Sequence, residues 1–346
     1  MFTVQVATSA EAATTGPALS VDVSAARHAI SSDIYGLNGG DPAFNAEIGQ
    51  SVARWGGNAS SRYNFKNHTY NTGSDWFFED IVADEAHSPE GMVRSNLDRD
   101  IKPVVTVPLS GWVARDSSPS HPFTCGFPTT GFPQQDRFDE GDPNCGNGLL
   151  NQQNLTGVPT DSSIEAGPAF GGEMVVYAVD EFGAAAQGGV PIYELDNEPV
   201  LWASTHRDVH PGPVRYDELD GKGTAAAAAI KAADPGAAVL GPSGWGYCGW
   251  VASGLDGCGP GADSAAHGGL NLSHWYLKHE GLSTRSLWDP TYVEESWIGP
   301  VRQRAAAAVH PHGEVVGRPV QPRHQDRHHR VQLGALGDIN GGLAQA

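Results

Sequence analysis

The fold is decided by the stretch Val190-Pro-Ile-Tyr-Glu-Leu-Asp-Asn-Glu-Pro-Val-Leu-Trp202. Its β-branched and aromatic residues from Val190 to Leu195 predict a short buried strand. Pro199 cannot donate a hydrogen bond to a sheet, so we expect the strand to end near Glu198. In a parallel α/β fold this is the carboxyl end of a strand, where loops gather and catalytic side chains lie.

The same stretch contains three closely spaced acids. Alternation along an extended strand would place Glu194, Asp196 and Glu198 on one side. Neighbouring carboxylates repel each other, so we expect at least one of them to have a partner or a raised pKa. A solvated turn after a strand is the alternative for Asn197-Glu-Pro199 taken alone. Motifs elsewhere in the chain favour a functional site.

The segments around this strand alternate between strand and helix patterns. Apolar residues at helical spacing predict a helix over 172–182, and an alanine-rich helix over 216–233 precedes a strand over 238–242. Upstream apolar runs predict strands at 34–40, 52–58 and 103–108. This rhythm is typical of a parallel barrel, so the predicted fold class is α/β.

The composition excludes some classes of partner. The 346 residues carry a formal net charge of -19, which argues against nucleic acid as a partner because nucleic acid requires basic patches. A neutral polysaccharide raises no such objection, and the nine Trp and nine Tyr residues offer faces that stack on sugar rings. No apolar run approaches the length that spans a membrane, so we expect no membrane partner.

Four cysteines fall into two close couples, Cys125 with Cys145 and Cys248 with Cys258, each flanked by glycine and polar residues. We expect two disulfides that close loops in an oxidising compartment, although sequence alone allows three connectivities. A zinc site is the alternative, but no CxxC couple supports it. The first couple lies in a long loop over 112–160 that we expect to be functional.

Aromatic, amide and charged residues are interleaved after the second predicted strand. The interleaved residues are Arg54, Trp55, Asn58, Tyr63, Asp75 and Trp76. Such a mixture is typical of a sugar-binding cleft. Ordinary packing within loops is the alternative.

These residues belong to a series of motifs that occur in a fixed order. The series is Arg54-Trp-Gly-Gly-Asn58, Arg62-Tyr-Asn64, Ser74-Asp-Trp76, Leu195-Asp-Asn-Glu-Pro199 with Trp202 and His206, Gly241-Pro242, and Leu287-Trp-Asp-Pro-Thr-Tyr292 with Ser296-Trp-Ile298. It resembles glycoside hydrolase family 44 over residues 34–300. Several motifs in the same order are more specific than any one of them.

The resemblance implies a retaining endo-β-1,4-glucanase or xyloglucanase on a (β/α)8 barrel, with a small β-sandwich built from both chain ends. It makes Glu198 the general acid/base and Asn197 a partner of the substrate 2-hydroxyl. It implies no required cofactor, a β-glucan polysaccharide as partner and a monomer. Residues in the implied substrate cleft are Arg54, Trp55, Asn58, Tyr63, Asp75, Trp76, Asn197, Trp202 and His206.

The second carboxylate of this mechanism is missing from the sequence. A retaining glycosidase needs two carboxyl groups about 5–5.5 Å apart, one protonated and one ionised. The resemblance implies that the second comes from the seventh strand in a Thr-Glu-Tyr context, and the chain contains no such motif. The nucleophile is therefore absent, and we expect the chain as written to be inactive.

The segment 301–333 offers a reason for the absence. It holds six Arg and five His against two acids and lacks helix or strand periodicity. Read one nucleotide later, the residue pairs from Gln321 to Leu333 allow Ser-Pro-Gly-Thr-Lys-Ile-Ala-Ile-Thr-Glu-Tyr-Asn-Phe. We interpret the segment as a frame-shifted translation, with the missing Glu across the codons of Arg330 and Val331. A basic tract for metal or nucleic acid is the other interpretation.

The predicted organisation has five parts. They are a signal-peptide remnant at 1–17, an N-terminal strand of the sandwich at 18–33, the barrel portion at 34–300, the aberrant segment at 301–333 and a resumed barrel segment at 334–346. The remnant predicts secretion to the extracellular space. The chain ends before an eighth strand, so we expect an incomplete barrel.

Two further expectations remain. A structural calcium is common in the resembled family, and the acid-rich loop offers Asp136, Asp139 and Asp142 as ligands, with an unpaired surface cluster as the alternative. The second function hypothesis is a non-catalytic β-glucan-binding protein that uses Trp55 and Trp202, together with Trp76, as stacking platforms.

Overall fold

The structure is a computed structural model that describes residues 30–85, 88–116 and 118–283. Several predicted features lie outside these ranges: the signal-peptide remnant, most of the N-terminal strand segment, the Arg/His-rich segment 301–333 with Arg330 and Val331, and the resumed segment 334–346. The described residues all belong to one compact unit of the chain, Met1–Ala305.

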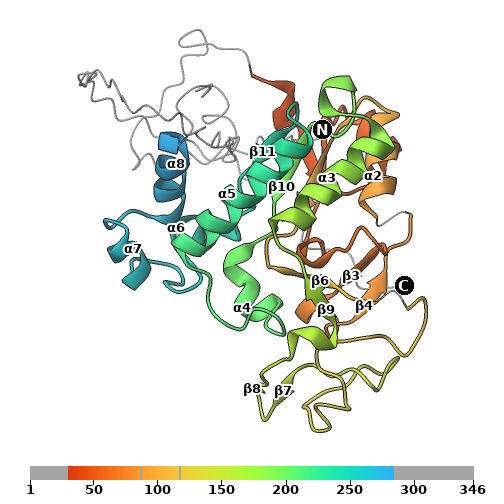
Figure 1. Ribbon diagram of the computed structural model, residues 1–346, viewed down its shortest axis with the longest axis vertical. Helices are drawn as coiled ribbons and strands as arrows, with labels where there is room; N and C mark the ends of the chain where they lie inside the picture. Colours follow the sequence, from red (N-terminus) through yellow and green to blue (C-terminus); the bar gives the residue numbers. More distant parts are fainter. Residues whose placement is uncertain (1–29, 86–87, 117, 284–346) are drawn as a thin grey trace, which may run out of the picture. The chain divides into compact units, whose positions relative to one another are not determined.

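A parallel sheet of five strands forms the centre of this unit (Figure 1). Its strands in spatial order are β1 (Gly36–Asn38), β2 (Val52–Trp55), β5 (Lys102–Val107), β10 (Ile192–Leu195) and β11 (Ala238–Leu240). Tyr193 of β10 pairs in register with Val105 of β5 and Val239 of β11. All five strands were predicted from their apolar runs.

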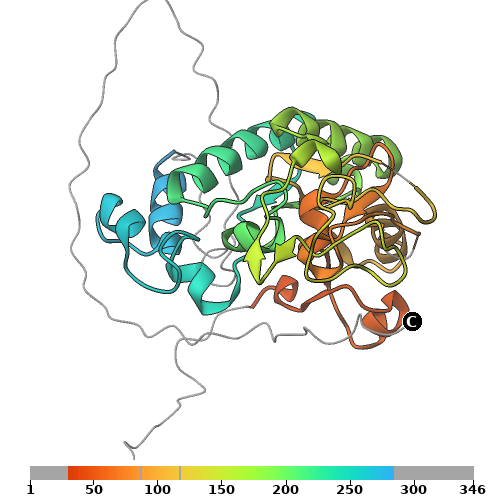
Figure 2. The ribbon, with the colours of Figure 1, turned by 90° about the horizontal axis from the view of Figure 1, so that it is seen from below.

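Two long helices, α3 (Pro168–Phe182) and α5 (Tyr216–Ala233), lie side by side along one face of the sheet in both views (Figures 1 and 2). Helix α3 begins four residues before the predicted start, because Pro168 occupies a first-turn position where its missing N–H costs nothing. Small residues allow the helices to approach closely: a Cβ added at Gly172 would lie 3.3 Å from the Cβ of Ala229.

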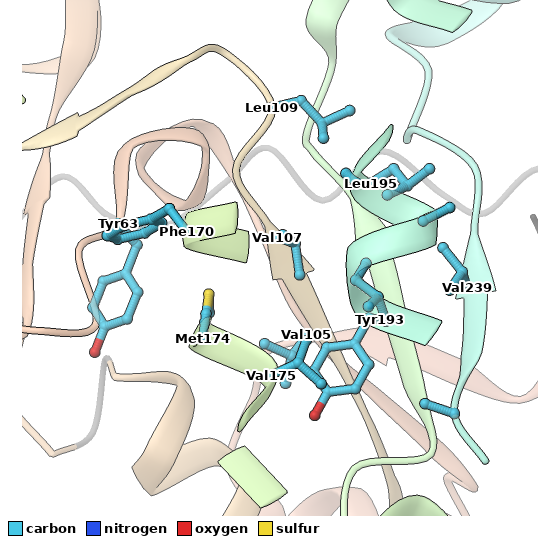
Figure 3. Packing of buried hydrophobic residues seen from close by; sticks show 14 of the residues in the cluster. Tyr63, Val105, Val107, Leu109, Phe170, Met174, Val175, Tyr193, Leu195 and Val239 are labelled. Carbon is cyan, nitrogen blue, oxygen red and sulfur yellow. The ribbon is translucent and has the colours of Figure 1, made fainter. Parts of the chain in front are cut away.

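The core fills the space between the sheet and these helices. Val105, Tyr193, Leu195 and Val175 are each at most 3% exposed, and Figure 3 shows them in one cluster. Burying an aliphatic or aromatic side chain of this size contributes about 1.5–3 kcal/mol each. This cluster therefore fixes the position of β10, the strand that carries the acidic turn.

The remaining elements are short. They are α1 (Pro42–Glu47), α2 (Pro89–Leu97), α4 (Trp202–Thr205), α6 (Gly246–Val251), α7 (Ala262–Ala266), α8 (Leu272–Ser283), the antiparallel pairs β3 (Thr69–Asn71) with β4 (Asp80–Val82), β6 (Trp112–Ala114) with β9 (Ser163–Glu165) and β7 (Leu149–Leu150) with β8 (Gln153–Asn154), and the 3-10 turns η1 (Ser32–Ile34), η2 (Asn58–Arg62), η3 (Gly73–Asp75), η4 (Pro159–Asp161), η5 (Ala185–Gln187) and η6 (Pro199–Leu201).

Both predicted disulfides are confirmed, and each closes a loop. Cys125 pairs with Cys145 in the long loop after β6, and Cys248 in α6 pairs with Cys258. No helix in the ranges 30–85, 88–116 and 118–283 is long and apolar enough to cross a membrane. The α/β class with a parallel sheet is confirmed. In the described part of the chain, β1 and β11 are the two edges of that sheet.

Candidate active site

The acidic turn leaves the sheet through two left-handed residues. Strand β10 ends at Leu195, and the next residues include Asp196 with φ 64° and Glu198 with φ 49°. Left-handed backbone at a non-glycine residue costs on the order of 1–3 kcal/mol and is found mostly at functional sites. The predicted alternation of the three acids is therefore wrong beyond Leu195, because the chain is no longer extended there.

Asp196 holds this turn in place. Its carboxylate accepts hydrogen bonds from the Ser61 hydroxyl at 2.5 Å, the Leu109 backbone N–H at 2.5 Å, the Asn197 backbone N–H at 2.7 Å and the Trp202 indole N–H at 3.3 Å. Burial raises the pKa of Asp196, and these donors act in the opposite direction. The carboxylate thus joins η2, the end of β5 and α4 to the turn.

The residues after Asp196 pair with the segment that follows β11. Asn197 forms a parallel bridge with Ser243, and the Glu198 N–H donates to the Ser243 carbonyl at 2.9 Å. Pro199 then opens η6. Glu198 is half-buried, at the carboxyl end of a central strand. This is the position expected of a catalytic carboxyl group in a parallel α/β fold.

Arg54 bridges three strand ends. Its guanidinium donates to Glu194 at 2.5 Å, to the Asn38 side-chain oxygen at 3.0 Å and to the Asn197 side-chain oxygen at 2.9 Å. Burial raises the pKa of Glu194, and Arg54 acts to lower it. The expectation of a partnered or pKa-raised acid is confirmed. The Arg54 contact also fixes which end of the Asn197 amide carries the oxygen.

Two predicted aromatic residues reach the surface near this turn. Trp76 is 53% exposed and lies edge-on to Phe77, with ring centroids 5.5 Å apart. Trp55 is half-buried, with its ring 5.1 Å from that of Tyr63. Asn58 is half-buried and Asp75 is exposed. An exposed indole of this kind is a surface on which a sugar ring can stack.

The loop that carries Trp76 rests directly on α4. Gly73 has φ 56°, and a Cβ added there would lie 2.5 Å from the Thr205 carbonyl oxygen and 3.0 Å from His206 Nδ1. Only glycine allows this backbone approach. The loop of Trp76 and the helix that follows the Glu198 turn are therefore in direct contact.

Three predicted cleft residues are fully buried in the structure and present no open side-chain surface to a substrate. Tyr63, Trp202 and His206 are each 0% exposed. The Tyr63 hydroxyl donates to Glu90 at 3.0 Å, and burial lowers the pKa of His206 well below its usual value. The sequence motifs placed these residues near the site but did not show whether their side chains face the solvent or the interior.

A buried acid cluster joins the long loop that was predicted to bind metal to Glu79, which directly precedes β4. Glu79, Asp139 and Asp142 are at most 5% exposed, and Glu79 Oε1 has no hydrogen-bond partner within the described ranges. Burial, together with the nearby Asp139 and Asp142, raises the pKa of Glu79 to about 8. Oxygen ligands of this type suit calcium.

The membership of this cluster differs from the prediction. Both oxygens of Asp136 accept backbone N–H groups, from Asn151 at 2.6 Å and Gln152 at 2.7 Å, and Asp136 is not among the grouped residues Glu79, Asp142 and Cys145. Glu79 was missed because it lies far from the acid-rich loop in the sequence and follows two phenylalanines. Cys145 lies beside Glu79 and Asp142, but its sulfur is in a disulfide.

Comparisons with known proteins agree with this geometry. The profile of Glycoside hydrolase family 44 matches residues 69–282. Endoglucanase A of Paenibacillus lautus is 26% identical over 86% of this chain and 48% of its own length, and Beta-mannanase/endoglucanase A of Caldicellulosiruptor saccharolyticus is 28% identical over 67% of this chain and 17% of its own length.

Solved structures of glycoside hydrolases are also similar to this chain. A bifunctional glucanase-xylanase from a metagenome library aligns with a TM-score of 0.69 at 31% identity, over 80% of this chain and 63% of that one. A Paenibacillus polymyxa xyloglucanase of glycoside hydrolase family 44 aligns with a TM-score of 0.51 at 27% identity, over 74% of this chain and 49% of that one. The chain spans about half the length of the first curated relative. The profile match over most of the described residues shows that the chain belongs to glycoside hydrolase family 44.

Proposed function

We propose that this chain descends from a retaining endo-glycosidase of β-1,4-glucan or xyloglucan in which Glu198 is the general acid/base. The observation that carries the proposal is the left-handed turn that presents Glu198 at the carboxyl end of β10. Relatives named endoglucanase and xyloglucanase support the substrate class. The parallel sheet supports the barrel part of the (β/α)8 fold. The N-terminal sandwich strand is proposed from the family resemblance alone.

The proposed chemistry begins with Glu198 protonating the leaving glycosidic oxygen. Asn197 contacts the substrate 2-hydroxyl, and Arg54 holds the Asn197 amide through its oxygen. Trp76, with Trp55, supplies a stacking surface for the polymer. A second carboxylate must attack the anomeric carbon from the opposite side of the sugar ring.

The nearest acids in sequence are not available for that attack. Glu194 is paired with Arg54, and Asp196 is held by four donors. The proposed nucleophile position, across the codons of Arg330 and Val331, lies outside the described residues. We therefore propose that the chain as written binds substrate without turnover.

The test compares two proteins on xyloglucan and carboxymethylcellulose. The chain as written is expected to release no reducing sugar. The chain with its reading frame restored across 301–333 and the remaining part of the expected barrel added is expected to hydrolyse with retention. In the restored chain Glu198→Gln should lower the rate of hydrolysis by a factor of about 10²–10⁴, because a general acid typically accelerates the reaction by that factor. Retaining hydrolysis by the unaltered chain, or near-native rate in Glu198→Gln, would refute the proposal.

A second candidate is a non-catalytic β-glucan-binding protein, and the exposed indole of Trp76 favours it. Trp202 is fully buried and is not one of its platforms. Affinity gels containing xyloglucan distinguish the candidates. Retarded migration that Trp76→Ala abolishes, without sugar release from the frame-restored chain, would favour binding alone.

We also propose a structural calcium held by Glu79, Asp139 and Asp142. One oxygen of Glu79 has no hydrogen-bond partner among the described residues, and the pKa of its carboxyl group is raised; both observations support a cation there. Calcium would neutralise these buried charges and fix the loop closed by Cys125 and Cys145. Metal analysis of the purified chain should find one calcium, and Asp142→Asn should remove it.

Export and a monomeric state complete the proposal. Two disulfides are typical of proteins made in oxidising compartments. Mass spectrometry of protein from culture medium tests export, and sedimentation tests the monomer. Retention of the chain inside the cell, or sedimentation as a dimer, would contradict the respective statement.

A further inference from the structure

The first turns of α5 carry acids that contact histidines from three separate segments. Helix α5 packs against β10, and its first turns therefore lie close to the candidate site. One histidine lies between α4 and α5, one directly follows α7 and one lies in α8. The pairs are Asp217 with His267 at 3.0 Å, Glu218 with His210 at 2.8 Å and Asp220 with His279 at 2.8 Å.

The contacts of His267 require a protonated ring. Its Nε2 faces the Asp217 carboxylate at 3.0 Å, and its Nδ1 faces the Asp263 carbonyl oxygen at 2.7 Å. Both neighbours are acceptors only, and a neutral imidazole has just one N–H. Burial acts to lower the pKa of His267, but the Asp263 carbonyl and Asp217 outweigh it and raise the pKa above its usual value.

The pair of Glu218 and His210 lies next to the candidate active site. The hydrogen bond from His210, against some cost of burial and with help from Lys222, lowers the pKa of Glu218 to about 2. The Lys222 ammonium lies 4.7 Å from the ring of Trp202, whose indole donates to Asp196. This pair is thus two contacts away from the turn of Glu198.

Trp275 connects the other two pairs. Its ring lies 4.7 Å from that of His267 and 5.0 Å from that of His279. Tyr216 stacks on the other side of His267, at 4.9 Å. The further charged groups around these rings are Asp263 at 3.5 Å from His267, Asp256 near Tyr216, and Lys278 beside His279 in the same open pocket.

We propose that these three contacts fasten the α4–α5 loop, α7 and α8 to the first turns of α5, and that the hold of His267, whose ring must be protonated to make both of its contacts, is released as the pH rises. The device is independent of turnover. It would make the packing of this side of the fold, and through Trp202 the support of the Glu198 turn, depend on pH.

The direction follows from linkage. The folded pKa of His267 is raised above its ordinary 6.5, so its stabilisation is complete below that value and is lost as pH rises through the folded pKa. Glu218 has the opposite sign: with a folded pKa of about 2 against 4.5, its stabilisation is lost as the pH falls below 4.5. The fastening is therefore complete between these limits.

The test is hydrogen exchange on the full chain at pH 5.5 and 8.5, expressed as protection factors corrected for intrinsic exchange. Amides of α7 and, through the Trp275 ring, of α8 are expected to lose protection at the higher pH, because the hold of protonated His267 is lost as the pH rises through its folded pKa. His267→Gln should abolish the difference between the two pH values. Asp217→Asn, which removes the charged acceptor of the His267 ring, should reduce it and provides a second variant if the first folds poorly.

His274→Gln is the matched control. His274 lies on α8, is exposed, and its ring makes no hydrogen bond or ion pair within the described part of the chain. The control should keep the full pH difference. Equal protection at both pH values in the unaltered chain, or an undiminished difference in both His267→Gln and Asp217→Asn, would overturn the proposal.

Discussion

Two regions of this molecule bury carboxylates in opposite ways. At the turn after β10, Asp196 accepts from four donors. Beside the long loop, Glu79 lies against Asp139 and Asp142, and one of its oxygens has no partner among the described residues. A buried acid surrounded by donors joins chain segments together. A buried acid surrounded by other acids needs a proton or a cation.

Removing the well-partnered acid should have the largest effect. Asp196→Ala leaves the Leu109 and Asn197 N–H groups and the Trp202 indole without an acceptor, so we expect a loss of about 3–5 kcal/mol in unfolding free energy. Urea unfolding measures it. Asp75→Ala removes the same charge from an exposed position and should change stability by less than about 0.5 kcal/mol. Equal losses in both variants would contradict the anchoring role.

The acid-rich cluster should respond to pH in the metal-free protein. The folded pKa of Glu79, about 8, exceeds its unfolded value of 4.5, so the folded state binds more protons between these limits and stability falls as pH rises. The slope is at most about 1.4 kcal/mol per pH unit. Thermal unfolding in EDTA should show it, and calcium should remove it.

Two variants check this assignment. Glu79→Gln should unfold with little pH dependence in the same range, with or without calcium. Glu140→Gln, at an exposed position of the same loop, should behave as the unaltered protein. If calcium leaves the pH dependence unchanged, the cluster is stabilised by protons alone.

Substitution of Arg54 tests whether the shape of its guanidinium group, as well as its positive charge, contributes to stability. Arg54→Lys keeps the charge near Glu194 but cannot reach Asn38 and Asn197 together, so we expect a loss of about 1–2 kcal/mol in unfolding free energy. Arg94→Lys, whose side chain is 53% exposed, should change stability by less than about 0.5 kcal/mol. Similar losses would show that charge alone is sufficient.

Trp76 should have the smallest effect on stability. Because the side chain is 53% exposed, Trp76→Ala should change unfolding free energy by less than about 0.5 kcal/mol while weakening retardation in xyloglucan gels. Trp202→Ala is the contrast, with an expected loss of about 3–5 kcal/mol because its ring is fully buried. Unchanged gel migration of Trp76→Ala would remove this residue from the binding surface.

The sequence was informative where one chain segment determines its own structure. The five strands follow from local apolar patterns, helix α5 from a run of alanines, and both disulfides from the spacing of the cysteines. The left-handed conformations of Asp196 and Glu198 do not, because they depend on donors from η2, β5 and α4. Local alternation therefore failed at the turn itself.

Burial was the other property that motifs did not reveal. Tyr63, Trp202 and His206 belong to the family motifs, yet all three side chains are buried beneath the site. Glu79 and Asp139 come together only after the loop closes. A motif tells which residues are needed near a site, whereas the side that each one faces is decided by packing with distant segments.

The glycine at position 73 has a consequence for substitution in this part of the chain. A side chain there would meet the Thr205 carbonyl oxygen, so any larger residue would push the segment that carries Trp76 away from α4, the helix that follows Glu198. A single methyl group at this position would therefore disturb the two segments together.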